Sequence, residues 1–253
     1  MVRRVLQRFR TMNARWNECV FREGTNTHLR YLAWIRELVK PGNTILDLGA
    51  GSVEIGSYLP VLKAHRTLVV AVDRDHRSLA VRPPGLGVVG DADRLPFGDG
   101  TAHVITASCF FEHVEYPERV VAECYRVLKP GGTLVFYTPH RWSYVAVIAR
   151  VTPMVFHRWV RALQTGKRAE EADVCPTYYR ANTLAALHRL RGPFRVRAMD
   201  LVIGAPSYTT FLPPPLHGVA IMYHLLVSRV GWLRRTVGEC LIGCWVKTGT
   251  ERV

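Results

Sequence analysis

The sequence has 253 residues, of which 48% are hydrophobic and 21% are charged, and its formal net charge is +14 at pH 7. This length and composition are typical of a globular protein with a substantial core, which excludes disorder as the main state. No apolar run reaches the roughly 18 to 20 residues that a spanning helix needs, and residues 1–12 lack the apolar stretch of a secretory signal. We therefore expect a cytoplasmic protein.

Basic residues are concentrated in the two ends of the sequence. Residues 41–140 are nearly neutral, whereas residues 1–40 and 141–253 carry the whole positive excess. Basic flanks favour an acidic partner, such as a nucleic acid, an anionic lipid surface or a phosphorylated substrate. An arginine-rich composition without functional meaning is the alternative. The six cysteines are scattered without a C-x-x-C pair, so we expect no metal site.

Strand and helix patterns alternate through residues 41–140. Apolar runs typical of buried strands lie at residues 43–48, 67–72, 86–90, 103–109 and 133–138. Helical patterns lie at residues 53–64 and 117–128, and the Lys-Pro-Gly-Gly sequence of residues 129–132 is expected to stop the second helix. Near-continuous apolar strands that alternate with helices predict a parallel sheet covered on both faces.

The pattern changes after residue 140. An apolar, aromatic stretch at residues 144–160 is interrupted by Pro153, residues 206–218 predict a proline-rich loop, and residues 219–233 are again apolar. A helix is expected at residues 182–190, and strands are expected at residues 194–202 and 241–248. Without a clear linker, we expect a single domain: a basic helical segment (1–40), a core (41–140) and a cap with the last strands (141–253).

A glycine-rich turn follows the first strand, where residues 47–52 read Asp-Leu-Gly-Ala-Gly-Ser. Glycines let the backbone approach a ligand, and a helix that begins there favours negative charge. The dinucleotide pattern G-x-G-x-x-G would need a glycine where this chain has Glu54, and no Gly-Lys-Ser/Thr follows as in a Walker loop. The turn therefore argues against NAD and against a Walker-type phosphate site.

Acidic residues lie at the ends of the first three strands or directly after them. Asp47 can orient an ammonium group, Asp73 can accept hydrogen bonds from two ribose hydroxyls, and Asp91 can accept one from an exocyclic amine. An amino acid, a ribose and an adenine in this order describe S-adenosyl-L-methionine (SAM).

Residues 43–140 also contain four stretches that resemble the class I SAM-dependent methyltransferases of the type 11 group: ILDLGAGS, VVAVDRD, GDADRLPFGDG and TASCFFEHVEYPERVVAECYRVLKPGGTLVFYTPH. The resemblance implies an α/β fold with a doubly wound, seven-stranded Rossmann-like sheet in the order 3-2-1-4-5-7-6, helical cap insertions and an antiparallel last strand. It also implies which residues bind SAM: Asp47, Gly49, Ala50 and Gly51 at the methionine end, Asp73 and Arg74 at the ribose, Asp91 and Ala92 at the adenine, and Ser108 near the sulfonium.

Methyl transfer from a sulfonium needs a general base only where the acceptor must lose a proton. Glu112, His113 and His140 follow the fourth and fifth strands, and we take His113 and His140 as the catalytic candidates because an imidazole titrates in the suitable range. Support of the adjacent turn is the alternative role of His113.

The sequence favours a small-molecule acceptor. Enzymes that methylate the amino groups of bases usually carry Asn/Asp-Pro-Pro-aromatic after the fourth strand, whereas residues 108–111 here read Ser-Cys-Phe-Phe. We therefore do not expect nucleic acid as a partner, and the acceptor atom stays open between oxygen, carbon and nitrogen. The apolar stretches favour a lipid-like acceptor or a peripheral contact with an anionic membrane, and packing as a plain cap is the alternative. An RNA-modifying methyltransferase that uses the basic flanks, and a SAM-binding module without catalysis, are the alternative functions.

Overall fold

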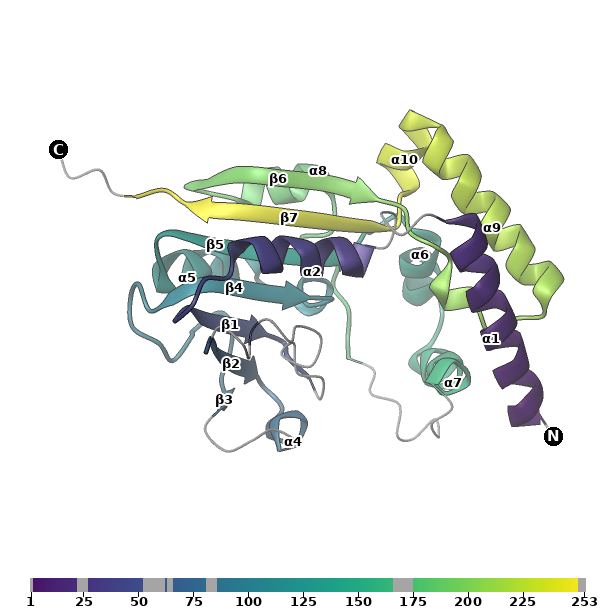
Figure 1. Cartoon of the computed structure of the whole chain (residues 1–253), viewed down its shortest axis with the longest axis horizontal. Coiled ribbons are helices and arrows are strands. Elements are labelled where there is room, and N and C mark those ends of the chain that lie inside the picture. The colour runs from purple at the N-terminus through teal and green to yellow at the C-terminus, as the bar shows by residue number, and fades with distance from the viewer. Residues whose placement is uncertain are drawn as a thin grey trace. The chain divides into compact units, whose positions relative to one another are not determined.

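The computed structural model of the chain describes residues 2–21, 27–51, 62, 66–80, 86–165 and 175–249 (Figure 1). The chain forms two compact units, each built from three segments. The helical unit comprises Met1–Leu29, Pro139–Thr177 and Leu201–Cys240, and the sheet unit comprises Arg30–Thr138, Tyr178–Asp200 and Leu241–Val253. The single-domain organisation stays a prediction.

A seven-stranded mixed sheet forms the sheet unit, and its strand order is β3-β2-β1-β4-β5-β7-β6. The strands are β1 (Thr44–Leu48), β2 (Leu68–Asp73), β3 (Gly87–Val89), β4 (Ala102–Ser108), β5 (Leu128–Pro139), β6 (Phe194–Val202) and β7 (Cys240–Lys247). The pairs β1–β2, β1–β4, β2–β3 and β4–β5 are parallel, and the arrow of β7 runs opposite to that of β6 in Figure 1. The predicted order and the reversed last strand are confirmed.

Strand β5 begins earlier than expected. The pairing of β4 with β5 passes from Ala102–Leu128 directly to Val104–Thr133, so residues 129–132 form an irregularity inside the strand. The preceding helix does end at Val127, as predicted. The Lys-Pro-Gly-Gly sequence thus follows the end of the helix, as predicted, whereas the expected strand start at residue 133 was wrong, because a β-bulge can take up extra residues without ending the strand.

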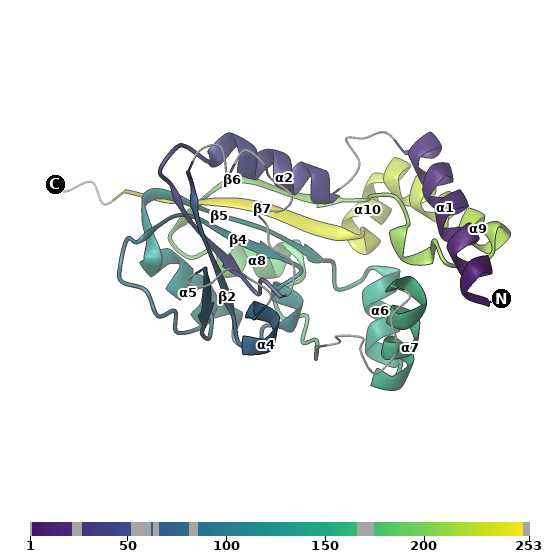
Figure 2. The ribbon, with the colours of Figure 1, turned by 60° about the horizontal axis from the view of Figure 1, so that its bottom comes forward.

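Helices cover both faces of this sheet. Helix α2 (Thr27–Leu38) lies on one face, and α5 (Pro117–Val127) and α8 (Leu184–Leu190) lie on the other (Figure 2). The ring of Tyr31 on α2 packs edge-to-face on Tyr137 of β5, with 5.0 Å between the centroids. Two short helices, α4 (His76–Leu79) and the 3-10 helix η3 (Phe111–His113), follow β2 and β4. The helix expected at residues 53–64 lies outside the described residues.

The helical unit contains α1 (Val2–Val20), α6 (Tyr144–Val151), α7 (Met154–Thr165), η5 (Ser207–Thr209), α9 (Pro214–Arg229) and α10 (Gly231–Val237). Pro153 separates α6 from α7, as its position in the sequence predicted. The loop expected at residues 206–218 was wrong in its second half, because Pro214 opens α9 as a first-turn proline. Among the described helices, none is long and apolar enough to cross a membrane.

Helix α1 lies beside α9 in both views (Figures 1 and 2). Asn13 of α1 is fully buried, and its Nδ2 donates to the carbonyls of Thr210 and Leu212, at 2.9 Å each. One turn later, Asn17 Oδ1 lies 3.1 Å from Nε2 of His217 on α9. Buried hydrogen bonds of this kind fix the register of the two helices, because an unpaired buried amide is costly.

Candidate functional site

The carboxyl ends of the parallel strands bring the candidate SAM-binding residues to one edge of the sheet. Asp47 of β1 is in register with Ala71 of β2 and with Thr106 of β4, and Asp73, the last residue of β2, is in register with Val89 of β3. The edge carries Asp47, Gly49, Ala50, Gly51, Asp73, Arg74, Asp91, Ala92 and Ser108 at strand ends or directly after them. In open α/β sheets, this edge is where ligands bind.

The glycine turn after β1 is held against β2 by three hydrogen bonds. The N–H groups of Gly49 and Ala50 donate to the carbonyl of Val72, at 2.9 and 3.3 Å, and the N–H of Gly51 donates to Asp73 Oδ2 at 2.8 Å. Both glycines have a positive φ, +61° at Gly49 and +54° at Gly51, which side chains rarely adopt. The turn therefore depends on glycine at both positions.

Space as well as backbone angle requires glycine at position 49. A Cβ atom at Gly49 would lie 2.5 Å from Cδ2 of Phe110, whereas a Cβ at Gly51 would meet no atom within 4 Å. Phe110 belongs to the segment after β4, so its ring brings that segment against the glycine turn. Gly49 thus permits a close approach inside the site, whereas no described residue crowds Gly51.

Asp47 is a buried carboxylate with a polar partner. Its side chain is 5% exposed, and Oδ1 accepts a hydrogen bond from Thr106 Oγ1 at 2.8 Å. Tyr31 lies in the same environment: burial raises its pKa well above the ordinary value, and the charge of Asp47 raises it further. A fixed negative charge in a buried setting can orient a cationic group strongly.

Arg74 and Asp91 form an ion pair across the ends of β2 and β3, with 3.2 Å between Nε and Oδ1. The Arg74 side chain is 79% exposed, so this pair contributes little to stability. Ala92, beside Asp91, is buried. The pair links Arg74, expected at the ribose, to Asp91, expected at the adenine.

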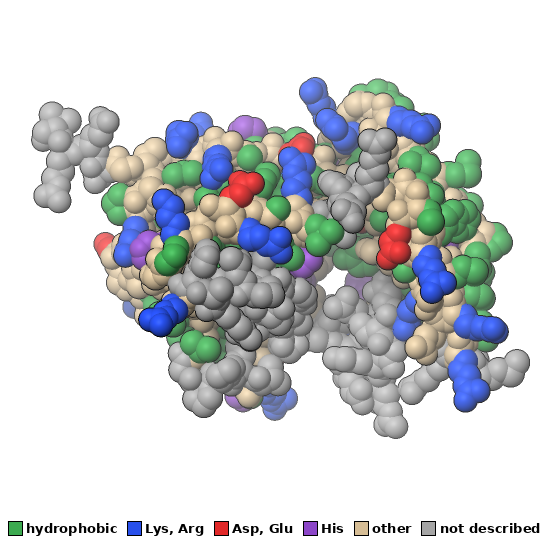
Figure 3. Space-filling model, in the orientation of Figure 1, with side chains coloured by type: hydrophobic (Ala, Val, Ile, Leu, Met, Phe, Trp, Pro, Cys, Tyr) green, Lys and Arg blue, Asp and Glu red, His purple; other side chains and the backbone are tan. Residues whose placement is uncertain are grey.

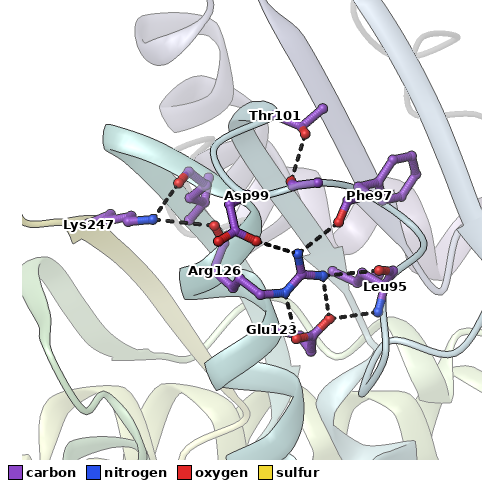
Figure 4. Close-up of polar contacts among 9 residues, drawn as sticks. Leu95, Phe97, Asp99, Thr101, Glu123, Arg126 and Lys247 are labelled. Carbon is purple, nitrogen blue, oxygen red and sulfur yellow. Dashed lines mark hydrogen bonds and ion pairs between the residues drawn. The ribbon is translucent and has the colours of Figure 1, made fainter.

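Arg126 of α5 holds the loop that follows the candidate adenine-binding residues (Figure 4). Its guanidinium donates to the carbonyls of Leu95 and Phe97, at 3.1 and 2.8 Å, and to Asp99 Oδ1 at 2.8 Å. Glu123, one turn earlier, binds Arg126 at 2.8 Å and accepts the N–H of Leu95 at 2.8 Å. The bonds from Arg126 hold the pKa of Glu123 below its usual range. The network fixes the course of this loop.

The segment after β4 places His113 close to the same edge. The N–H of Cys109 donates to the carbonyl of Tyr137 at 2.9 Å, and Cys109 has a φ of +48°. The chain turns there and enters η3, where the N–H of His113 donates to the carbonyl of Phe110 at 3.0 Å. Ser108, the last residue of β4, is half-buried.

Glu112 is part of a buried polar chain. Its Oε2 accepts from Thr138 Oγ1 at 2.7 Å, and Thr138 Oγ1 accepts from Asn182 Nδ2 at 2.6 Å. Burial raises the pKa of Glu112. Its backbone carbonyl accepts the N–H groups of Tyr178 and Tyr179, at 2.7 and 3.2 Å. Glu112 therefore ties the segment after β4 to β5 and to the chain before α8, which is an anchoring role.

His140 belongs to the helical unit. It is 3% exposed, and its N–H donates to the carbonyl of Glu239 at 2.7 Å. Burial lowers its pKa to about 4, and a backbone contact with Gly238 opposes this in part. Its Nδ1 has no hydrogen-bond partner among the described residues. Burial thus keeps the imidazole neutral and makes it a weak proton acceptor, and its catalytic role stays a prediction.

Three residues that shape the site were missed by sequence reasoning: Thr106, Phe110 and Arg126. Thr106 lies beside Asp47 because the register of β1 and β4 pairs the two residues. Arg126 bonds the carbonyl of Phe97, which is 29 residues away in the sequence. Phe110 stood within a quoted motif, but its contact with the glycine turn follows from packing. Within the described part of the chain, no group of three His, Cys, Asp or Glu side chains is arranged to hold a metal ion.

A family model described as a methyltransferase domain (Methyltransf_11) matches residues 46–136, from the middle of β1 to the middle of β5. Residues 46–136 are therefore similar to the methyltransferase domains of this family. The match covers the glycine turn, the acids after β1 to β3 and the segment after β4. All the candidate SAM-binding residues lie inside the matched residues.

Curated relatives match the methyltransferase domain and part of its surroundings. A malonyl-[acyl-carrier protein] O-methyltransferase of Methylococcus capsulatus is 38% identical over 117 residues, which are 42% of this chain and 41% of the relative. A demethylmenaquinone methyltransferase of Streptomyces avermitilis is 35% identical over 138 residues, 48% of this chain and 58% of the relative. The chain thus spans about half the length of the curated relatives that it matches.

Solved structures share the fold over most of the chain. A Haloferax volcanii methyltransferase, described in complex with the Trm112 activator, is 21% identical with a TM-score of 0.54, and the match covers 95% of this chain and 98% of that chain. Geranyl diphosphate C-methyltransferase of Streptomyces coelicolor, solved with S-adenosyl-L-homocysteine, is 14% identical with a TM-score of 0.54, covering 87% and 78%. These likenesses support the Rossmann-like methyltransferase fold of the whole chain.

Proposed function

We propose that this chain is a SAM-dependent methyltransferase that transfers a methyl group to a small, apolar molecule. The observation that carries the proposal is the convergence of Asp47, Asp73 and Asp91 on one edge of the sheet, with the glycine turn between the first two. Three acids at the ends of successive strands, next to an open backbone, fit an amino acid, a ribose and an adenine in that order.

The Asp73 carboxylate has acceptor capacity for a ribose. Among the described residues, it accepts from the N–H groups of Gly51 and Asp75. A carboxylate has about four acceptor positions, which is enough to accept from ribose hydroxyls as well. We assign Asp47 with Gly49, Ala50 and Gly51 to the methionine end, Asp73 with Arg74 to the ribose, and Asp91 with Ala92 to the adenine end. Gly51, which no described residue crowds, suits a ligand that lies against the backbone.

SAM supplies a methyl group on a positively charged sulfur, which needs no further activation. The tasks of the protein are to position the acceptor, to exclude water and to hold a proton where the acceptor loses one. We assign Ser108 a place near the sulfonium, and His113 and His140 the role of candidate bases. His113 follows β4 within the sheet unit, and His140 directly follows β5.

Relatives and surface chemistry support an apolar acceptor. The relatives named above act, by their names, on malonyl-acyl carrier protein and on demethylmenaquinone. In the helical unit, α6 and α7 expose large apolar side chains: Val151 (76%), Val155 (76%), Phe156 (38%) and Trp159 (54%). We propose a quinone-like or other lipid-like acceptor with a reacting oxygen, carbon or nitrogen, and a protein that acts in the cytoplasm with peripheral contact to a membrane.

Two measurements on the full chain test the proposal. Calorimetry with SAM and S-adenosyl-L-homocysteine should show binding that Asp73→Asn weakens. Incubation with methyl-labelled SAM and a panel of quinols, phenols and acyl carrier protein thioesters, followed by mass spectrometry, should show a methylated product. Absence of SAM binding would contradict the proposal, and tight binding without a product in any acceptor class would favour a SAM-binding module without catalysis.

The histidines are tested within the same assay. His113→Gln and His140→Gln should each lower the rate without changing SAM affinity if that residue serves as the base, and the remaining rate should rise with pH as the acceptor ionises by itself. A variant that keeps the full rate at neutral pH excludes that histidine as a base. Methylation of RNA, with an affinity that falls steeply with salt, would instead support the RNA-modifying alternative.

A further inference from the structure

Helix α9 exposes an apolar face to solvent. Four large side chains lie three or four residues apart along it and are mostly exposed: Leu216 (55%), Val219 (64%), Met222 (72%) and Leu226 (56%). The opposite face is buried in the helical unit through His217, Ile221, His224 and Val227. The exposed half of the helix is therefore apolar and is not covered by the rest of the described chain. A surface of this kind normally marks an interaction site.

Aromatic residues of two neighbouring helices extend this face. Trp16 of α1 is 41% exposed, and its ring lies against Gly218, where a Cβ atom would come within 3.1 Å of it. Trp232 of α10, three residues after the end of α9, is 69% exposed. We call Trp16, Trp232 and the four exposed residues of α9 the apolar face. Tryptophan is the side chain that concentrates where an apolar phase meets water.

Arginines surround the apolar face. Arg229 ends α9, and Arg234 and Arg235 follow on α10; all three are exposed. Together α1, α9 and α10 carry eight arginines against one acid, Glu18. Figure 3 shows hydrophobic side chains gathered over α9, with Lys and Arg side chains at both ends of this region. A partner that is complementary to the apolar face and to these arginines presents an apolar surface bordered by negative charge.

We propose that the apolar face docks on the surface of an anionic lipid bilayer, with α9 lying in the membrane plane. The four side chains and the tryptophans enter the boundary between headgroups and acyl chains, and Arg229, Arg234 and Arg235 contact the anionic headgroups. A second copy of the chain fits less well, because a symmetric pair would bring the same arginines together. The proposal deepens the lipid-like acceptor proposed above, but the face belongs wholly to the helical unit.

Vesicle sedimentation with the full chain tests the proposal. Equimolar phosphatidylglycerol and phosphatidylcholine vesicles should bind the protein, pure phosphatidylcholine vesicles should bind it more weakly, and salt should release it. Arg229→Gln/Arg234→Gln/Arg235→Gln should weaken binding to the anionic vesicles about 100-fold, since each nearby cation contributes about tenfold or less. Met222→Gln/Leu226→Gln should weaken binding to both vesicle types by tenfold or more.

Matched variants of the sheet unit serve as controls. Leu68→Gln removes a side chain that is 48% exposed at the start of β2, and Arg36→Gln/Arg189→Gln/Arg195→Gln removes the same charge from exposed positions. Both should bind anionic vesicles as the unchanged protein does. If the two arginine triples weaken binding equally, overall charge rather than this face attracts the membrane, and the proposal is overturned.

Two further outcomes overturn it. Equal, negligible sedimentation with both vesicle types excludes membrane docking, and a dimer in sedimentation equilibrium that Met222→Gln/Leu226→Gln dissociates would assign the face to a second copy. SAM calorimetry on every variant separates this proposal from the proposed function. Unchanged SAM affinity with lost vesicle binding supports the docking face, whereas SAM binding absent from all forms contradicts the proposed function and leaves the vesicle result standing.

Discussion

The N–H of Gly51 donates to Oδ2 of Asp73 at 2.8 Å, and Asp73 Oδ1 accepts the N–H of Asp75 at 2.9 Å. A single carboxylate thus ties the glycine turn after β1 to the start of the turn after β2. These hydrogen bonds fix the turn before a ligand binds. Binding therefore costs less conformational entropy than it would at a flexible turn.

Asp73→Ala should lower SAM affinity by roughly 1.5–3 kcal/mol, because it removes charged hydrogen bonds to the ribose and loosens the Gly51 turn. The fold should persist, since Asp73 lies at a strand end outside the core. Calorimetry measures the affinity, and circular dichroism checks the fold. Glu118→Ala, which removes an exposed acid from the first turn of α5, should leave the affinity unchanged. Unaltered SAM binding in Asp73→Ala would remove Asp73 from the site.

Gly49→Ala should destabilise the protein by roughly 2–4 kcal/mol, because the positive φ and the contact with Phe110 both oppose a Cβ atom. Gly42 is the matched control: its φ is +75°, but a Cβ there would meet no atom within 4 Å. Gly42→Ala should therefore cost only about 1–2 kcal/mol. Urea unfolding of the two variants measures the difference, and equal losses would show that the Phe110 contact relaxes freely.

Arg126→Met should destabilise the protein by about 2–3 kcal/mol, since it removes charged hydrogen bonds from the loop of Leu95 and Phe97 and leaves Glu123 without its cation. SAM affinity should fall as well, because this loop follows the candidate adenine-binding residues. Arg119→Met, an exposed change on the same helix, is the control. A normal affinity in Arg126→Met would show that the loop keeps its course without the network.

The ion pair of Glu123 with Arg126 also makes the stability of the protein depend on pH. The folded-state pKa of Glu123 lies below the ordinary 4.5, so its contribution to stability is present above about pH 4.5 and is lost as the pH falls through the folded-state pKa. Arg126→Met should therefore lose less stability in acid than the unchanged protein. Unfolding curves of both proteins from neutral to acidic pH make the comparison, and parallel curves would contradict it.

Glu239→Gln should flatten the pH dependence of stability near neutrality. Burial raises the pKa of Glu239 to about 7, and the hydrogen bond from the Gly204 N–H opposes this in part. Its stabilising contribution is fully present below about pH 4.5 and is lost as the pH rises through 7. Between about pH 5 and about pH 8 this amounts to roughly 2–3 kcal/mol, which urea unfolding can resolve.

Three buried histidines of the described chain act in the opposite direction. Burial lowers the pKa values of His140, His217 and His224, so they reduce stability as the pH falls below about 6.5. All three are present with and without Glu239→Gln and cancel in the comparison. Identical pH profiles of the two proteins would mean that Glu239 ionises freely in the folded state.

The strands could be predicted well from the sequence. A strand buried on both faces is a nearly unbroken apolar run, so β1, β2, β4 and β7 lie within one residue of their expected bounds. The start of α9 could not be predicted, because a proline suits both a loop and the first turn of a helix. Tertiary contacts decide it: His217 is buried and lies within hydrogen-bond distance of Asn17 and Thr209.

The residues of the candidate site could likewise be predicted only in part. Its acids and glycines could be named because each stands in a local motif at a strand end. Thr106, Phe110 and Arg126 could not, because each acts through a partner that only strand register or packing brings near. The ion pair of Arg74 with Asp91 is another example, since residues 17 positions apart meet only where β2 and β3 lie side by side.

The pairing of α1 with α9 also determines when the helical unit can form during synthesis. Asn13 and Asn17 find their partners at Thr210, Leu212 and His217, which the ribosome adds roughly 200 residues later, or about 10–40 s at ordinary elongation rates. Through that interval the apolar side of α1 has no native partner. Nascent chains of this protein should therefore engage chaperones at their N-terminal helix, and should become independent of them only after α9 has left the ribosome.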